Sequence, residues 1–306
     1  MGIAKGTAAL LFQLKTECLF EGRVLQLGKQ TLLIDSHELP EVANQFGFQV
    51  DVDDVVIDSD GEYVSHTYND VVFFKKLGFE EVLSLDHSGY EDADIIHDLN
   101  VPVPEELRGT FDFVYDGGTL EHVFDFPQCL RNVHYLLKVG GIAAFSSPSH
   151  NHVDHGFYMF SPTIYWDYFH ANGYRIVKAN AFEYDRYGPN REWLVYEYDP
   201  ALFQPLDLGG WGRKPLGIWF VVEKLEGSTC DVIPQQGKYV DAWSGVTEYD
   251  LPDEAVRRQG TSAQRIRDLV RSIPVIGGAM VARRRQVRRF FEDHGRQSRP
   301  PVIARY

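Results

Sequence analysis

A group of histidines with one aspartate lies near the middle of the chain. Its members, which fall within six residues, are His150, His152, Asp154 and His155. A further histidine, His122, lies earlier in the sequence. Histidine is suited to remove a proton from a hydroxyl group because its pKa lies near neutrality. We therefore expect His155 to act as a base, with His122 as the second candidate.

The same group allows two other interpretations. One is substrate binding, which we predict for His152, Asp154 and Tyr158. The other is a divalent metal site, but the pattern H-x-H-x-D-H does not match the ligand spacing of a known type of site. We therefore predict no metal ligands, and expect His150 to satisfy backbone groups in a polar loop.

A glycine and three aspartates lie at the ends of four predicted strands. The strands span residues 23–28, 81–86, 93–100 and 111–116, and the residues at their ends are Gly28, Asp86, Asp98 and Asp116. Parallel strands end at one edge of a sheet, where a carboxylate can accept both ribose hydroxyls of a nucleoside and a glycine allows close approach. We assign the ribose to Asp86 and the adenine amine to Asp98, with the backbone of Leu99 meeting a ring nitrogen.

The stretch from residue 111 to 148 must position these groups. It predicts a strand over 111–116, a polar turn, a helix with apolar residues from Leu120 to Leu137, an end at Gly140-Gly141 and a strand from 142. Apolar spacings of three, four and seven predict a helix that packs one face on a sheet. Alternating strands and helices favour an α/β fold with a doubly wound, mostly parallel sheet, whose last core strand spans 216–225.

Four pieces of this region resemble the class I S-adenosylmethionine-dependent methyltransferases. They are VLQLG at 24–28, LSLD at 83–86, HDLN at 97–100, and DFVYDGGTLEHV with its helix and LKVGG turn at 112–141. The resemblance covers roughly residues 22–224 and implies a Rossmann-like fold, in-line methyl transfer and S-adenosylmethionine as cofactor. The cofactor-binding residues that it implies are Gln26, Gly28, Asp86, His87, Asp98, Leu99, Asp116 and Gly117.

The glycine-rich loop departs from the family pattern. Where the family has E-x-G-x-G-x-G, this chain has Gln26-Leu27-Gly28-Lys29-Gln30, with a single glycine. The loop either takes a different path around the methionine end of the cofactor, or cofactor binding is weakened or lost. A methyltransferase-fold scaffold without catalysis, serving a glycan assembly complex, is therefore an alternative.

Residues 155–174 resemble a subset of these enzymes from bacterial surface-polysaccharide and glycan pathways. This resemblance implies a sugar or glycan-precursor hydroxyl as the methyl acceptor. A small aromatic or polyketide acceptor is the other alternative.

Composition and charge set the remaining expectations. The chain has 306 residues and a net charge of −14, but residues 256–306 hold 13 arginines and three acidic residues. The rest of the chain is thus about −24, which argues against nucleic acid as a partner. Three cysteines without a short spacing, and no signal-like segment, favour a reducing, cytoplasmic location.

We expect a methyltransferase domain over residues 1–237 and a C-terminal extension over 238–306 that is irregular, then basic and partly helical. The basic segment over 263–291 could contact an anionic membrane surface, or pack on the acidic body of its own chain or of a second copy in a homo-oligomer.

Overall fold

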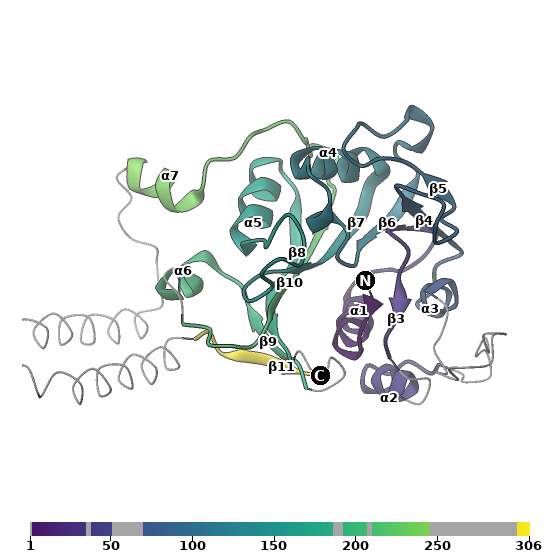
Figure 1. Ribbon diagram of the computed structural model, residues 1–306, viewed down its shortest axis with the longest axis horizontal. Coiled ribbons are helices and arrows are strands. Elements are labelled where there is room, and N and C mark those ends of the chain that lie inside the picture. Colours follow the sequence, from purple (N-terminus) through teal and green to yellow (C-terminus); the bar gives the residue numbers. More distant parts are fainter. Residues whose placement is uncertain (1, 35–37, 51–69, 186–191, 207–209, 245–298) are drawn as a thin grey trace, which may run out of the picture. The chain divides into compact units, whose positions relative to one another are not determined.

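The computed structural model describes residues 2–34, 38–50, 70–185, 192–206, 210–244 and 299–306 (Figure 1). The chain divides into two compact units. The first comprises residues 1–198, 213–234 and 302–306, and the second comprises 199–212 and 235–301. The predicted basic segment over 263–291 lies outside the described residues. No helix among those described is long and apolar enough to cross a membrane.

The first unit is built on a nine-stranded sheet in the order β11-β9-β8-β10-β7-β6-β2-β4-β5. Its strands are β2 (Arg23–Leu27), β4 (Glu81–Asp86), β5 (Ile95–Ile96), β6 (Phe111–Asp116), β7 (Leu137–Pro148), β8 (Arg175–Glu183), β9 (Leu194–Glu197), β10 (Leu216–Glu223) and β11 (Val302–Arg305). The pairings make seven of these strands run in one direction, with β9 and β10 reversed. The predicted mostly parallel sheet is therefore confirmed.

Helices cover both faces of this sheet, as a doubly wound arrangement requires. They are α1 (Lys5–Glu17), α2 (Glu38–Gln45), α3 (Asp70–Lys76), α4 (Phe126–Leu136) and α5 (Pro162–Ala171). Figure 1 shows α4 and α5 on one side of the sheet and α1 on the other. Short elements complete the unit. Strand β1 (Gly2–Ile3) pairs with β3 (Thr31–Leu32), and two 3-10 turns, η1 (Glu105–Leu107) and η2 (Leu120–His122), lie in the connections.

Alternation along the strands fills the two layers of the core. Phe113 of β6 and Trp219 of β10 belong to the cluster that contains the buried face of α1. Phe145 of β7 points the other way and packs on Tyr165 and Phe169 of α5, with ring centroids 5.1 and 5.5 Å apart. Those two α5 aromatic residues are thus core residues.

The boundaries of the predicted helix in the 111–148 stretch are wrong. Residues Leu120–His122 form the 3-10 turn η2, and α4 begins only at Phe126. Asp125 caps α4 by accepting from Gln128 N–H at 3.0 Å, and Pro127 fits the first turn, where its missing N–H costs nothing. The helix also ends before the glycines, because β7 starts at Leu137 and continues through Gly140. The strand predicted over 93–100 is limited to the two residues of β5.

Two strands of this sheet, β9 and β11, were not predicted. They pair antiparallel with each other, and Trp193 and Tyr306 exchange backbone hydrogen bonds of 2.8 and 3.2 Å beside them. The last residues of the chain therefore belong to the sheet of the first unit, although the predicted methyltransferase domain stopped at residue 237.

The second unit carries α6 (Pro200–Phe203), the 3-10 turn η3 (Gln204–Leu206) and α7 (Gly237–Ser244). Asp199 caps α6 by accepting from Ala201 N–H at 2.7 Å. Arg299 stacks over the ring of Trp211, 5.1 Å from its centroid.

Candidate functional site

The turn after β6 is organised by a buried carboxylate. Asp116 is fully buried, and its Oδ1 accepts from the N–H groups of Thr119 (2.8 Å), Gly118 (3.3 Å) and Leu120 (3.4 Å). Burial raises the pKa of Asp116, while these hydrogen bonds act in the opposite direction. Asp116 therefore fixes the path of the turn that leads directly into Glu121.

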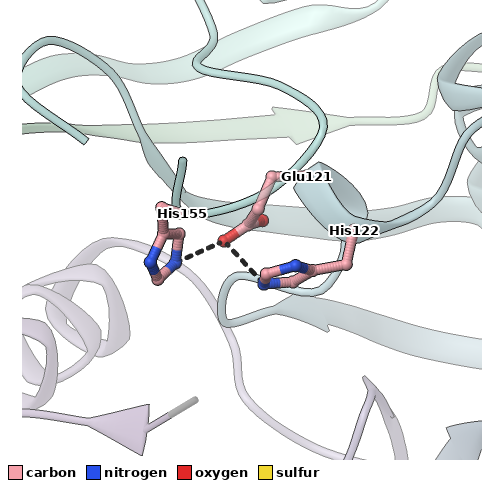
Figure 2. A group of neighbouring side chains, drawn as sticks. All are labelled: Glu121, His122 and His155. Atoms are coloured by element: carbon pink, nitrogen blue, oxygen red, sulfur yellow. Dashed lines mark ion pairs between the residues drawn. The ribbon is translucent and has the colours of Figure 1, made fainter. Parts of the chain in front are cut away.

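Glu121 lies between two imidazoles (Figure 2). Its Oε1 is 3.5 Å from Nε2 of His155 and 3.9 Å from Nε2 of His122. The two imidazole rings are 5.3 Å apart. The Glu121 side chain is 0% exposed, whereas those of His155 and His122 are 41% and 44% exposed. The two predicted bases are thus partly exposed and lie next to one buried carboxyl group.

The loop between β7 and α5 brings His155 to this position. Tyr158 N–H donates to the Glu121 carbonyl at 3.2 Å, and Phe160 N–H donates to the Pro148 carbonyl at 2.9 Å. Gly156 allows the close approach, because a Cβ there would stand 2.8 Å from the carbonyl oxygen of Glu121. The loop is therefore fastened to the η2 turn directly after His155, through Gly156 and Tyr158.

Burial governs the electrostatics of this group. It raises the pKa of Glu121, and the nearby Asp116 carboxylate raises it further. Burial also lowers the pKa of His122, with a second contribution from His155. A buried carboxyl with a raised pKa beside exposed imidazoles is an arrangement typical of functional sites.

The other predicted substrate residues lie around this group without joining it. His152 Nε2 is 3.2 Å from the Tyr184 hydroxyl, and burial lowers the pKa of His152 to about 4. The Tyr158 hydroxyl donates to the Phe124 carbonyl at 2.6 Å. Asp154 is exposed and has a positive φ of 64°. His150 is also exposed.

The predicted nucleoside residues lie at the ends of β4 and β5. Asp86 is half-buried, and its Oδ1 accepts from Ser88 N–H at 3.1 Å. His87 Nδ1 lies 3.9 Å from Oδ1 of Asp98, so these two predicted residues are neighbours. Hydrogen bonds from the backbone and side chain of Asn100 lower the pKa of Asp98. The carboxyl oxygens of Asp86 and Asp98 are acceptors that suit ribose hydroxyls or an exocyclic amine.

The single glycine of the β2 loop has a close neighbour from the β6 turn. Gly28 has a φ of 70°, and a Cβ there would stand 2.3 Å from Thr119 Oγ1, which itself donates to the Leu27 carbonyl at 2.6 Å. Gln30 lies against Gly117, since a Cβ on that glycine would stand 2.1 Å from Gln30 Oε1. Gln26 points into the core, where its amide donates to Asp70 at 3.0 Å.

These residues fit a cofactor unequally at its two ends. The nucleoside end has accessible carboxylates at Asp86 and Asp98. At the methionine end, Gln30 Oε1 is buried and accepts no hydrogen bond from any residue that the structure describes. Such an orphan acceptor suits the ammonium group of an amino acid. Gln26, which was predicted to bind the cofactor, is fully buried in the structure.

Sequence reasoning placed Glu121 at the strand end but assigned it no role, and it assigned none to Thr119 or Gln30. Glu121 is part of the LEHV motif, so the motif itself was the available signal. Its burial between two histidines depends on the loop around Gly156, which no local pattern indicates.

No protein-family model matches the chain, and no curated protein matches it. Solved structures of S-adenosylmethionine-dependent methyltransferases do resemble it. One from Mesorhizobium loti is 15% identical, with 72% of this chain and 100% of that chain covered and a TM-score of 0.36. One from Archaeoglobus fulgidus is 12% identical, with 72% and 95% covered and a TM-score of 0.39.

A phosphoethanolamine N-methyltransferase from Haemonchus contortus, in complex with phosphomonomethylethanolamine and S-adenosylhomocysteine, is 9% identical. It matches 72% of this chain with 53% of its own, at a TM-score of 0.37. Because these TM-scores lie below 0.5, the chemistry of this chain has to come from its own residues.

Proposed function

We propose that this protein is an S-adenosylmethionine-dependent O-methyltransferase that acts on a hydroxyl of a sugar or glycan precursor. The observation that carries the proposal is the common edge of three neighbouring strands. Strands β4, β2 and β6 are paired in register at Leu85, Leu27 and Asp116, so their ends lie together. A ligand in an open α/β sheet binds at this edge, where the strand order reverses.

The cofactor would lie along this edge in a defined direction. Asp86 would accept the ribose hydroxyls, and Asp98 with Leu99 would bind the adenine. Gln30 Oε1 and the backbone around Gly28 and Gly117 would receive the methionine end. When bound, the sulfonium supplies the electrophilic methyl group, so the protein contributes mainly positioning and deprotonation.

Deprotonation of the acceptor falls to the histidine group. An alcohol is a weak nucleophile, so a base within reach of its proton is needed. In the metal-free protein we assign this role to His155, whose Nε2 lies 3.5 Å from the buried Glu121 side chain and whose ring is 41% exposed to an acceptor, and His122 is the second candidate. We expect His155→Ala to reduce turnover by about 10²–10⁴-fold, as for the loss of a general base. Full turnover by this variant would remove His155 as the base.

Exposed aromatic residues beside the histidines bear on the acceptor. Phe124 and Phe157 are each two residues from a histidine of the group and meet edge to face, with ring centroids 5.8 Å apart. Such a pair can stack on the apolar face of a sugar, but it equally suits a small aromatic or polyketide acceptor, which is the second candidate function. A panel of sugar, phenolic and polyketide acceptors with a methyl-transfer readout separates the two.

Calorimetric titration with S-adenosylmethionine tests the first premise. We expect binding, weakened about 10-fold or more in Asp86→Asn, because a hydrogen bond to a charged group contributes roughly 1.5–3 kcal/mol. Glu91→Gln removes the same charge from an exposed residue nearby and is the matched control. Absence of binding at millimolar cofactor would refute the proposal and favour the non-catalytic scaffold. The Thr119 hydroxyl, which lies close beside Gly28, is the observation that supports this alternative.

The C-terminal extension over residues 238–306 belongs to the same proposal. Its 13 arginines from residue 256 onward would meet an anionic lipid surface, or the acidic body of the same or a second chain. Flotation with vesicles that contain anionic lipid, at low and high salt, separates these cases. Absence of vesicle binding at both salt concentrations would remove the membrane version.

A further inference from the structure

We propose that Glu121, His122 and His155 form a binding site for a divalent transition-metal ion, with a coordination position left open for the acceptor hydroxyl. Ion binding stands on the geometry of the three side chains alone. The role of the ion in methyl transfer rests on the proposed function.

The spacing of the three ligand atoms suits a common metal ion. One carboxylate oxygen and two imidazole nitrogens all lie within 4.8 Å of one another. Metal–ligand distances of about 2.0–2.2 Å place the ligands of a tetrahedral site roughly 3.3 Å apart. The separations from Glu121 Oε1, 3.5 and 3.9 Å, are slightly wider. Both imidazoles are partly exposed, so small rotations of these rings can bring the three atoms to the required distances.

The same separations argue against ordinary hydrogen bonds. A hydrogen bond between a charged imidazole and a carboxylate is about 2.7–2.9 Å long. Neither histidine comes that close to Glu121, and both approach the same oxygen from different sides (Figure 2). Two imidazoles that converge on one carboxylate without bonding to it are arranged around a common centre.

The burial of Glu121 provides the independent observation. Its side chain is 0% exposed, and neither carboxylate oxygen has a hydrogen-bond partner among the residues that the structure describes. A buried carboxyl group without a hydrogen bond lowers the stability of the fold. Natural proteins retain such a group mainly where a ligand completes the site. A cation between Glu121 and the two histidines would satisfy it.

The donor set indicates the class of ion. Two imidazole nitrogens and one carboxylate oxygen suit Zn²⁺, Co²⁺, Mn²⁺ or Fe²⁺, whereas Mg²⁺ and Ca²⁺ prefer oxygen ligands throughout. Three protein ligands with exposed histidines are typical of a catalytic site with an open position, since structural zinc sites use four protein ligands.

The open position gives the ion a chemical role. A hydroxyl oxygen bound to a divalent cation loses its proton far more readily than in water. In the proposed reaction the hydroxyl proton passes to solvent at the exposed side of the histidines. The O–CH3 bond then forms as the S–CH3 bond breaks, and the electron pair of the broken bond stays on sulfur. His155 would thus act as a ligand in the loaded protein rather than as a free base.

Binding of Co²⁺ to the full-length, tag-free protein, after removal of metals with a chelator, tests the site. We expect one ion per chain, visible d–d absorption bands and displacement by Zn²⁺ but not by equimolar Mg²⁺. His155→Ala and Glu121→Gln should each weaken binding by more than about 100-fold, since even outer-sphere partners of a metal contribute 10–100-fold. His150→Ala changes an exposed histidine in the same loop and should bind like the unaltered protein.

Three results would overturn the site: no uptake of Co²⁺ or Zn²⁺, unchanged uptake by His155→Ala, or equal loss in His150→Ala. His155 is partly exposed, so its variant tests the site even if Glu121→Gln does not fold. Titration with S-adenosylmethionine separates this inference from the proposed function. Ion binding without cofactor binding would leave the site standing and remove the methyl transfer, and full methyl transfer in excess chelator would remove the role of the ion.

Discussion

Two buried polar side chains, one on α4 and one just before it, differ in their hydrogen bonding. Asn132, on α4 itself, makes four hydrogen bonds of 2.9–3.1 Å: its amide donates to the carbonyls of Leu99 and Val101 and accepts from Val103 and Gln128. Glu121, just before α4, is equally buried, and its carboxylate accepts none from the described residues. Buried polar groups that hold a fold together are satisfied, and those that await a ligand are not.

The same contrast distinguishes a second asparagine from the site. Asn172 donates to the carbonyls of Tyr168 and Val232, and accepts from Val232 N–H and the Thr229 hydroxyl. It fixes the segment around residue 230 to the end of α5. The two asparagines therefore hold neighbouring segments of the fold together, whereas the Glu121 carboxyl group contributes no hydrogen bond to the described residues.

The largest expected effect comes from breaking the satisfied group. Asn132→Ala leaves the N–H of Val103 buried without its partner, and leaves the carbonyl of Leu99 with only the weak Cys129 thiol donor at 3.7 Å. Each unsatisfied group costs about 1–3 kcal/mol, so we expect a loss of about 3 kcal/mol in the free energy of unfolding, measured in urea. Asn44→Ala, on the exposed side of α2, is the control and should change little. A loss below about 1 kcal/mol at Asn132 would contradict its structural role.

The next largest effect is expected at Gly28, where the end of β2 packs against Thr119. Gly28→Ala places a Cβ at a φ of 70° and 2.3 Å from the Thr119 hydroxyl, so we expect a loss of about 2 kcal/mol. Gly109 also has a positive φ, of 61°, but no atom lies within 4 Å of the added Cβ. Gly109→Ala should therefore cost only the backbone strain, about 1 kcal/mol.

A double-mutant cycle separates strain from collision at Gly28. In a Thr119→Ala background, Gly28→Ala should cost about as much as Gly109→Ala, because the hydroxyl is gone. An unchanged cost in that background would mean that Thr119 does not occupy the space beside Gly28.

The sequence predicted the edge of the sheet better than the contents of the site. Alternating apolar strands and a glycine or aspartate at each strand end are local patterns, so the positions of Gly28, Asp86 and Asp116 were found correctly. Helix α4 was predicted to begin too early because Leu120 and Val123 continue its apolar spacing, although the cap at Asp125 separates them from it.

What remained unpredictable depends on contacts between distant residues. His155 lies 34 positions after Glu121 and meets it only because the loop over Gly156 folds back on η2. Strand β11 depends likewise on a partner, β9, more than 100 residues earlier in the chain. No pattern within a window of ten or twenty residues carries such information.

A smaller effect on stability is expected from His134, whose side chain has a hydrogen-bond partner. His134 Nδ1 is 2.6 Å from the Tyr174 hydroxyl, and burial, followed by the charge of Lys224, lowers the pKa of His134 to about 4. The unfolded chain, with a histidine pKa near 6.5, binds the proton more readily. The contribution of His134 to the free energy of unfolding is therefore fully present above pH 6.5 and is lost as the pH drops toward 4.

The contribution of His134 should be about 1 kcal/mol, because the side chain is only half-buried and solvent screens part of the shift. Urea unfolding at pH 7 and pH 5 measures it. His134→Gln should lower this pH dependence, while His170→Gln, on the exposed side of α5, controls for the loss of one histidine. Equal pH dependence in the two variants would assign the acid sensitivity to other groups.

The smallest expected change in stability comes from the unsatisfied carboxylate itself. Glu121→Gln keeps the shape of the side chain and replaces a buried carboxyl group that accepts no hydrogen bond from the residues that the structure describes. We expect the free energy of unfolding, measured in urea without metal, to stay within about 0.5 kcal/mol of the unaltered protein or to rise. Added Zn²⁺ should raise the melting temperature of the unaltered protein and leave that of Glu121→Gln unchanged, because an ion that binds only the folded state stabilises it. If Glu121→Gln lowered the free energy of unfolding as much as Asn132→Ala, Glu121 would have a structural role like that of Asn132. The distinction between the two buried groups would then fail.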